Sequence, residues 1–159
     1  MPIPPHLYIT GTRQGKIEGP CPITGREGSI IVQQFDHEIL IPRSTQTGQP
    51  TGKRVHNPLV IVKAFDKASP KLYQALTTGE ILSEVVLKFF RITPLGKEEH
   101  YFTIKLEDAV IQAMAAFVPS CLDQNYARFT HMEKVSFVYA KIIWTWEEDG
   151  IESEDEWKI

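Results

Sequence analysis

The chain has 159 residues, of which 42% are hydrophobic, and a formal net charge of −3. This length suits one domain, which we expect to span residues 1–159, and it allows a core that buries about 70% of the unfolded surface without disulfide staples. No apolar run approaches the about 18 residues of a membrane span, and the N-terminus has neither the basic nor the apolar region of a secretory signal. We therefore expect a cytoplasmic origin, no signal peptide and no membrane insertion.

The first half of the chain is rich in strand patterns. Apolar and polar residues alternate in His6–Thr12, which is typical of a half-buried strand. Glycine and proline in Arg13–Gly28 indicate loops. Two further strands are predicted at Ser29–Gln34 and Phe35–Ile41, and another follows at Leu59–Phe65.

The most informative segment is Ser44–Pro58, which separates two of these strands. Hairpin connections usually have about two to five residues, and a much longer one is normally functional or disordered. The segment contains only one aliphatic residue, so it cannot form a core of its own. Lys53, Arg54 and His56 can donate hydrogen bonds to carboxylates, and the acidic segment Glu147–Glu156 is one candidate source of them. We therefore predict that Ser44–His56 forms an extended hairpin arm that touches a neighbouring subunit or ring.

One short helix is predicted at Ser69–Thr78. Ser69 can cap its first turn, and Pro70 fits the first helical position, where no backbone N–H is needed. Gly79 suits the left-handed position that follows a helix. Because the apolar stripe is short, we expect this helix to close a barrel end or to pack on a sheet.

The strand Val85–Ile92 has apolar residues on both faces, among them Phe89 and Phe90. A strand buried on both faces needs a second cover, which either the helix or a neighbouring subunit supplies. A further strand is predicted at His100–Leu106, after a turn at Pro94–Glu99.

Two later segments are less clear from their pattern. Glu107–Val118 contains alanines and apolar residues at helical spacing, so its pattern slightly favours helix over strand. Val135–Trp146 is a long strand pattern in which the apolar phase changes near Ala140–Lys141. This change predicts either a bulge or burial of both faces.

The C-terminal segment 147–159 is strongly acidic. Besides Lys158 it contains seven acids: Glu147, Glu148, Asp149, Glu152, Glu154, Asp155 and Glu156. Such a run is commonly a solvated tail, but Trp157 is costly to leave in water. A frayed tail and a docked segment both stay open. Taken together, the patterns predict a mainly β fold: a two-sheet β-barrel or sandwich with one short side helix at about Ser69–Thr78 and a long extended hairpin loop.

Known catalytic and metal-binding patterns are not matched. GTRQGK at 11–16 imitates a phosphate loop, but only three residues separate its glycines, and Ile17 stands where a hydroxyl residue is needed. The five histidines form no i, i+4 pair. Asp36 and Glu38 would lie on the strand face opposite to His37. We therefore predict no enzyme activity, no catalytic residue, no cofactor and no metal.

Nucleic-acid binding and disulfide formation are also not expected. Nucleic-acid binding needs a basic face with interleaved aromatics, whereas Lys53 and Arg54 form only a small patch and the acidic segment repels phosphate. Cys21 and Cys121 match no zinc spacing and no CxxC motif. We expect both to remain free thiols, because the protein folds in a reducing compartment.

Motifs along most of the chain resemble those of one family. The match is densest at residues 47–58 (TGQPTGKRVHNP) and continues at 66–70 (DKASP) and 78–80 (TGE). Further matches are 86–91 (VLKFFR), 97–102 (KEEHYF) and 155–157 (DEW), while Arg13–Arg26 is only loosely matched. In this combination the chain resembles the haemolysin-coregulated proteins (Hcp), the tube subunits of bacterial type VI secretion systems.

This resemblance implies a two-sheet β-barrel with one side helix, a homo-hexameric ring, and stacked rings that form a secreted tube with effectors in its lumen. It implies the spike protein, sheath and baseplate components and secreted effectors as partners. It also implies that Glu107–Val118 is a strand, which we adopt, and it offers no catalytic residues to carry over.

The residues that we expect at interfaces between subunits or rings lie in the arm, in the two-faced strand and near the C-terminus: Thr47, Gln49, Lys53, Arg54, His56, Phe89, Phe90 and Trp157. The alternative function is a monomeric β-barrel binding module that grips a peptide or ligand through the 44–58 loop.

Overall fold

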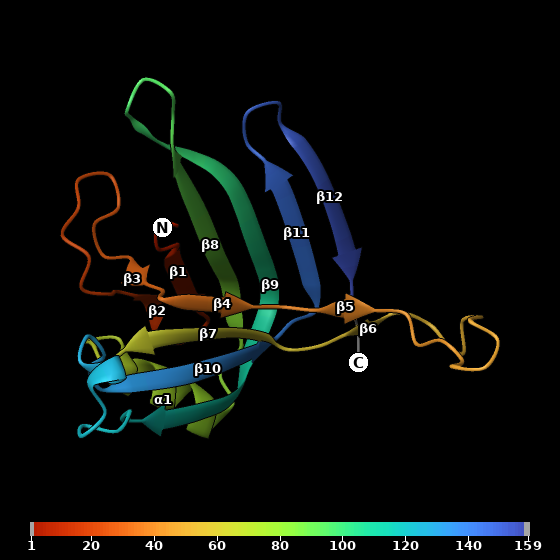
Figure 1. Cartoon of the computed structure of the whole chain (residues 1–159), viewed down its shortest axis with the longest axis horizontal. Helices are drawn as coiled ribbons and strands as arrows, with labels where there is room; N and C mark the ends of the chain where they lie inside the picture. Colours follow the sequence, from red (N-terminus) through yellow and green to blue (C-terminus); the bar gives the residue numbers. More distant parts are fainter. Residues whose placement is uncertain (1, 158–159) are drawn as a thin grey trace.

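The fold is seen in a computed structural model, which describes residues 2–157 (Figure 1). It is mainly β with one α-helix in this range, as predicted. The strands are β1 (His6–Gly11), β2 (Gly15–Ile17), β3 (Ile30–Ile31), β4 (Gln34–Asp36), β5 (Ile39–Leu40), β6 (Val55–His56), β7 (Leu59–Ala64), β8 (Leu82–Ile92), β9 (Glu98–Phe117), β10 (Met132–Val138), β11 (Lys141–Trp146) and β12 (Ile151–Glu156). The helix α1 spans Ser69–Thr78, and a 3-10 turn lies at Gln124–Tyr126.

The long strand β9 belongs to both layers of the fold. Its first part pairs antiparallel with β8 and β11, and its last part pairs with β10. The upper layer continues through β8 to β1 and through β11 to β12, and the lower layer runs from β10 through β7 to β4. The two layers are therefore one hydrogen-bonded sheet that turns over on itself, and β5 and β6 form a separate two-stranded sheet (Figure 1).

The bend of β9 lies at Asp108, which has a positive φ of 50°. Aspartate adopts this left-handed conformation more readily than most residues. Glu107 still pairs with β11, whereas Val110 already pairs with β10, so the strand changes layers here. The helical pattern of Glu107–Val118 is thus not realised, and the strand implied by the family resemblance is confirmed. Pairing with β10 along Val110–Phe117 outweighs the helix propensity of the alanines.

The change of phase near Ala140–Lys141 has a different cause from the predicted bulge. β10 ends at Val138 in the lower layer, and β11 begins at Lys141 in the upper layer. The side chains that alternate along Val135–Trp146 therefore face the same core from opposite layers. The prediction of one continuous strand was wrong, because a change of layers and a bulge give the same pattern in sequence.

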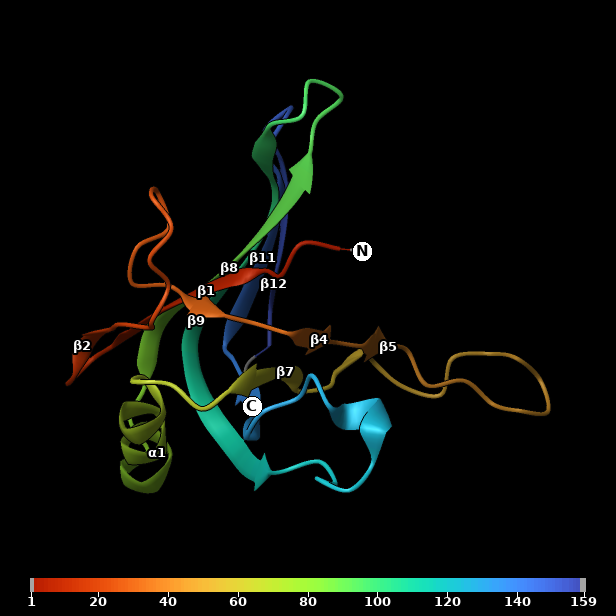
Figure 2. The ribbon, with the colours of Figure 1, turned by 60° about the vertical axis from the view of Figure 1, so that its left-hand side comes forward.

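The core between the layers is aliphatic. Leu7, Ile61, Leu87, Leu106 and Phe137 are each at most 2% exposed. The helix adds its apolar side to this core and packs against β9 at the lower end of the molecule (Figures 1 and 2). It does not cover the second face of β8, where Val86 is half-buried beside Tyr8 and Lys88.

The start of α1 is held by a buried polar network. The residue before the helix is Ala68, and Ser69 makes no capping hydrogen bond, contrary to the prediction. Its hydroxyl instead donates to Glu133 (2.7 Å) and accepts from Lys63 (3.1 Å). Lys63 also forms ion pairs with Glu133 and Asp66. Both Lys63 and Glu133 are 0% exposed. As predicted, Gly79 ends the helix in the left-handed conformation, with φ 66°.

Candidate interaction surfaces

The most prominent surface feature is an arm, which we define as residues 41–54. It is carried by the β5–β6 hairpin and extends away from both layers (Figures 1 and 2). Ser44 donates its backbone N–H to the carbonyl of Gln49 (2.8 Å), and Arg43 pairs with Pro50 across the hairpin. The predicted extended hairpin loop is confirmed. Its backbone is internally hydrogen-bonded, while Thr47, Gln49 and Lys53 are exposed.

The base of the arm is clamped to the core by a chain of hydrogen bonds. His56 Nε2 lies 2.6 Å from Asp155 Oδ2, and His56 Nδ1 lies 2.6 Å from the hydroxyl of Tyr139. His37 Nε2 contacts the same hydroxyl at 3.0 Å. Arg54 donates to Asp155 at 2.5 Å and to the carbonyl of Glu156 at 2.9 Å. The clamp therefore joins both ends of the arm to β12 and to the corner between β10 and β11.

The partners fix the direction of each hydrogen bond in the clamp. A carboxylate only accepts, so a neutral His56 carries its single proton on Nε2 and uses Nδ1 as an acceptor. Tyr139 then donates its single hydroxyl proton to His56 and accepts a proton from His37 Nε2. Each polar atom in this series of hydrogen bonds thus has one role, and protonation of either imidazole disturbs the series.

The environment shifts the pKa values of three clamp residues. The hydrogen bond from Arg54 is the largest cause that lowers the pKa of Asp155, and partial desolvation opposes it. Burial, together with the charge of Asp155, raises the pKa of Tyr139. Burial is also the main cause that lowers the pKa of His37, to which the neighbouring His56 adds. At neutral pH the clamp consequently contains an ionised aspartate and an uncharged tyrosine.

Trp157 completes the clamp. Its ring stacks on His56 with the centroids 5.0 Å apart, and its backbone N–H donates to Ala140 at 2.7 Å. Residues 151–156 pair with β11 as strand β12. Of the two alternatives for the acidic segment, the docked one is therefore correct as far as Trp157; residues 158–159 lie outside the described part of the chain.

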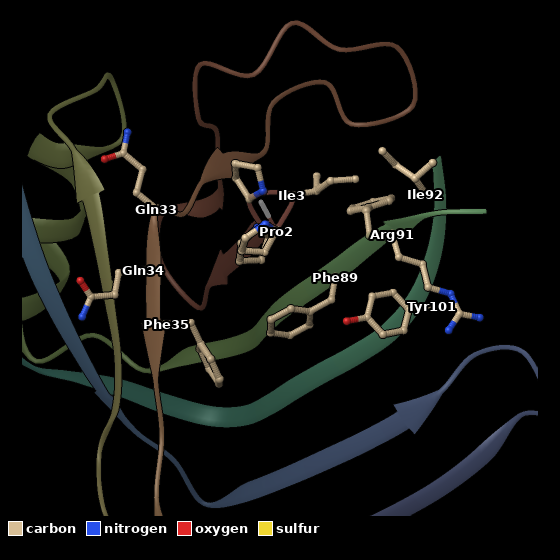
Figure 3. Close-up of a pocket in the computed structure, with 12 residues that line it drawn as sticks. Pro2, Ile3, Gln33, Gln34, Phe35, Phe89, Arg91, Ile92 and Tyr101 are labelled. Carbon is tan, nitrogen blue, oxygen red and sulfur yellow. The ribbon is translucent and has the colours of Figure 1, made fainter. Parts of the chain in front are cut away.

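A second candidate surface is an aromatic cleft of about 480 Å³ (Figure 3). The N-terminal residues 2–5, residues 33–35 and the outer part of β8 surround it, and Tyr101 of β9 contributes to its wall. Phe89 packs edge-to-face on Phe35 at 5.4 Å and on Phe102 at 6.1 Å. Ile92, at the rim, is 64% exposed.

Phe90 has partners of its own beside the cleft. The guanidinium of Arg26 lies 3.7 Å above its ring, and His6 meets the ring edge-to-face at 5.4 Å. Arg26 is in turn ion-paired with Glu98. These contacts fasten the loop before β3 onto the β8–β9 hairpin, so Phe90 is partly occupied within the chain.

The cleft borders an acidic edge formed by two hairpin ends. Arg91 donates to Glu99 (2.6 Å) and to Glu148 (3.2 Å), and thereby joins the β8–β9 hairpin to the β11–β12 hairpin. Its guanidinium also lies 4.9 Å from the centroid of Tyr101 and 5.1 Å from that of Trp146. Residues 147–156 contain seven acids and no basic residue.

The structure divides the predicted interface residues into three groups. Arg54, His56 and Trp157 meet at the base of the arm, Thr47, Gln49 and Lys53 lie along it, and Phe89 and Phe90 lie at the cleft. Sequence reasoning did not single out Tyr139 or His37 for the clamp. The signals for Asp155 were its place in the acidic segment that was expected to supply carboxylates to the arm, and its place in the 155–157 motif beside an apolar tryptophan.

Among residues 2–157 no group of histidine, cysteine or acidic side chains is arranged to hold a metal ion, and no helix in that range is long and apolar enough to cross a membrane. Cys21 is buried and Cys121 is exposed, and each carries a free thiol.

Comparison with known proteins gives consistent matches. The family model described as "Type VI secretion system effector, Hcp" matches residues 6–146. The chain is 46% identical, over 167 aligned residues, to the "Major exported protein" of Pseudomonas aeruginosa, with 99% of this chain and 97% of that protein covered. The chain is similar in structure to one described as "Crystal structure of Hcp protein" (TM-score 0.90, 34% identity, 98% of each chain covered). It is also similar to the secreted protein Hcp3 from Pseudomonas aeruginosa (TM-score 0.79, 39% identity, 98% and 99% covered).

These matches cover almost the whole chain and agree with the motif resemblance, the two-layer fold and the single helix. They also place the chain among secreted proteins. The chain therefore belongs to the Hcp family of type VI secretion system proteins, a family of structural, secreted tube proteins and not of enzymes.

Proposed function

We propose that the chain is a structural subunit of the type VI inner tube. Copies close into a hexameric ring, rings stack into a tube, and the exported tube carries effectors in its lumen. The observation that carries this proposal is the arm: a hydrogen-bonded hairpin that is clamped at its base, projects from the molecule and contributes nothing to the core. A rigid projection of this kind lowers the entropic cost of binding a partner.

The predicted interface residues take different parts in this assembly. Thr47, Gln49 and Lys53 touch a neighbouring copy, because they are exposed along the arm. Arg54, His56 and Trp157 act as positioning residues that hold the arm from within the chain. Phe89 and Phe90 contribute a second surface at the cleft, and a neighbouring copy covers their exposed parts in the assembly.

The chain acts as one domain over residues 1–159, is made in the cytoplasm, and leaves the cell through the machine. The spike protein, sheath and baseplate components are its partners in the machine, and secreted effectors are its cargo. Family membership supports these assignments.

Shortening the arm tests the proposal. Replacing residues 44–53 with a glycine-containing turn should leave the two layers folded, because loop-closure entropy changes slowly with length. Size-exclusion chromatography with light scattering should show a hexamer for the parent chain and weaker ring closure or stacking for the shortened one. Secretion from the producing bacterium should fall in parallel.

Two results would contradict the proposal. A parent chain that stays monomeric at micromolar concentration would favour the binding module that grips a peptide or ligand through residues 44–58. A shortened chain that assembles and is secreted like the parent would remove the arm from the assembly. A point variant of the arm, Lys53→Ala, is tested by the same measurements. Its matched control is Lys97→Ala, since Lys97 is an exposed lysine in a different turn.

A further inference from the structure

The aromatic cleft has the properties of a docking site. Phe89, Tyr101 and Phe35 belong to its wall and are all half-buried, and its rim carries the exposed Ile92 (Figure 3). Aromatic side chains that are partly exposed in a concave surface are typical of a binding hot spot. Contiguous apolar surface of this kind on a soluble protein commonly marks an interaction site.

The arm has the complementary shape and chemistry. Its tip is a polar turn at residues 44–49, which Pro50 follows directly, and Ile41 at its start is 49% exposed. Extended segments that contain proline dock in aromatic-lined grooves at low entropic cost, because their backbone is already restricted. The bridge between Arg43 and Pro50 keeps this tip extended before any contact forms.

The arm and the edge of the cleft also carry charges of opposite sign. The arm contains three basic residues and no acid; Arg54 is engaged with Asp155 in the clamp, which leaves Arg43 and Lys53 for a partner. The cleft adjoins Glu99 and Glu148 through Arg91, and next to Glu148 lie two further acids of the same hairpin end. Complementary potentials of this kind favour encounter and fix orientation more than they raise affinity.

The arm of one molecule does not reach its own cleft. In both views the arm extends away from the body in a direction different from that of the β8–β9 and β11–β12 hairpins (Figures 1 and 2). A contact between the two surfaces therefore joins two copies through different patches. Repetition of such a head-to-tail contact gives a closed ring or an open filament, depending on the rotation between copies.

We propose that the aromatic cleft of one copy receives the tip of the arm of a second copy, with Pro50 against Phe89 and Tyr101 and with Arg43 and Lys53 next to the acidic hairpin ends. The inference rests on the proposed function, because it presumes assembly, and it deepens that function by naming both contacting surfaces.

Site-specific photo-crosslinking tests this contact. A copy with benzoylphenylalanine in place of Pro50 is mixed with a copy labelled with ¹⁵N. The mixture is irradiated at several protein concentrations, from those that give single rings to those that give sedimenting assemblies. We expect mass spectrometry to find crosslinks between the two isotopic forms that join position 50 to residues 89–92 or 101. The same photo-reactive group at Leu122, which is 97% exposed elsewhere, should not label the cleft.

A variant of the cleft strengthens the test without disturbing the core. Ile92→Asp places a charge at the rim, where the side chain is 64% exposed, so the fold should tolerate it. We expect it to reduce the crosslink yield about tenfold, which corresponds to about 1.4 kcal/mol. The matched control is Ile81→Asp, an exposed isoleucine at 48% that does not line the cleft, and its yield should equal that of the parent.

Light scattering on the same samples separates the two proposals. If rings or sedimenting assemblies form but every crosslink falls outside the cleft or within one chain, the docking inference is overturned and the tube function stands. If the chain is monomeric throughout, both are overturned. Equal crosslink yields for the Ile92 and Ile81 variants also count against the cleft.

Discussion

The clamp at the base of the arm makes a quantitative prediction for Asp155→Ala. The imidazole of His56 is 1% exposed, and Asp155 is the acceptor of its Nε2–H at 2.6 Å. A buried donor left without an acceptor costs about 1–3 kcal/mol. Because Asp155 is 28% exposed, water reaches the vacated position, which places the expected loss in the free energy of unfolding at about 1–2 kcal/mol.

The matched control for this change is Asp155→Asn. The amide oxygen of asparagine can still accept from His56, so we expect a loss well below that of the alanine variant. Urea unfolding of both variants gives the two free energies. Amide hydrogen exchange gives a local measure, since exchange at residues 54–56 should speed up in Asp155→Ala while β7 and β10 stay protected.

The reasoning fails if the alanine and asparagine variants lose the same free energy of unfolding. It fails equally if exchange at the arm base is unchanged, because the arm would then be positioned by its backbone pairing alone. If it succeeds, Asp155→Ala should also weaken assembly more than its effect on stability explains.

Three further predictions concern the buried ion pair, the cysteines and the histidines. Glu133→Ala should lower the free energy of unfolding by about 3–5 kcal/mol, because it leaves Lys63 buried without its main partner. The double variant Lys63→Met with Glu133→Leu should lose less free energy of unfolding than this single change. Urea unfolding compares the two variants, and equal losses would contradict a buried ion pair. In the native state a thiol reagent should label the exposed Cys121 and not the buried Cys21. Under denaturing, non-reducing conditions both cysteines should react. If neither reacts, they are oxidised and the prediction of free thiols is wrong. Burial lowers the folded-state pKa of His6, His37 and His100, so the unfolded chain binds protons first as the pH falls. The free energy of unfolding should therefore decrease below about pH 6.5. Melting temperatures between about pH 7.5 and 5 measure this, and a flat profile would contradict the pKa shifts.

Much of the fold follows from local patterns in the sequence. The limits of α1 and the left-handed Gly79 come from propensity and backbone sterics, which act within a few residues. The arm follows from the absence of apolar residues in a long connection. Bending of β9 at Asp108 and the change of layers at Ala140 could not be predicted, because they depend on which strands pair, and a two-residue period is the same in either layer.

The candidate surfaces were less accessible to sequence reasoning. Arg54, His56 and Trp157 were expected to meet a partner, and each has a partner inside the chain. Tyr139 contacts His56 across 83 positions of sequence, and no spacing rule connects residues so far apart. Family resemblance supplied what local pattern could not, since it implied the strand at Glu107–Val118 and gave weight to the motif at 155–157.

The shared strand β9 has a consequence for how the protein folds. It has 20 residues and is thus about 65 Å long, and both layers depend on it for an edge to pair with. Neither layer can detach as a separate unit, so we expect unfolding in a single cooperative transition with no stable half-molecule. Its partner strands β10 and β11 are the last to leave the ribosome before β12. Until they arrive, β9 presents an unpaired edge that can join with other chains, which makes this interval the aggregation-prone step of biosynthesis.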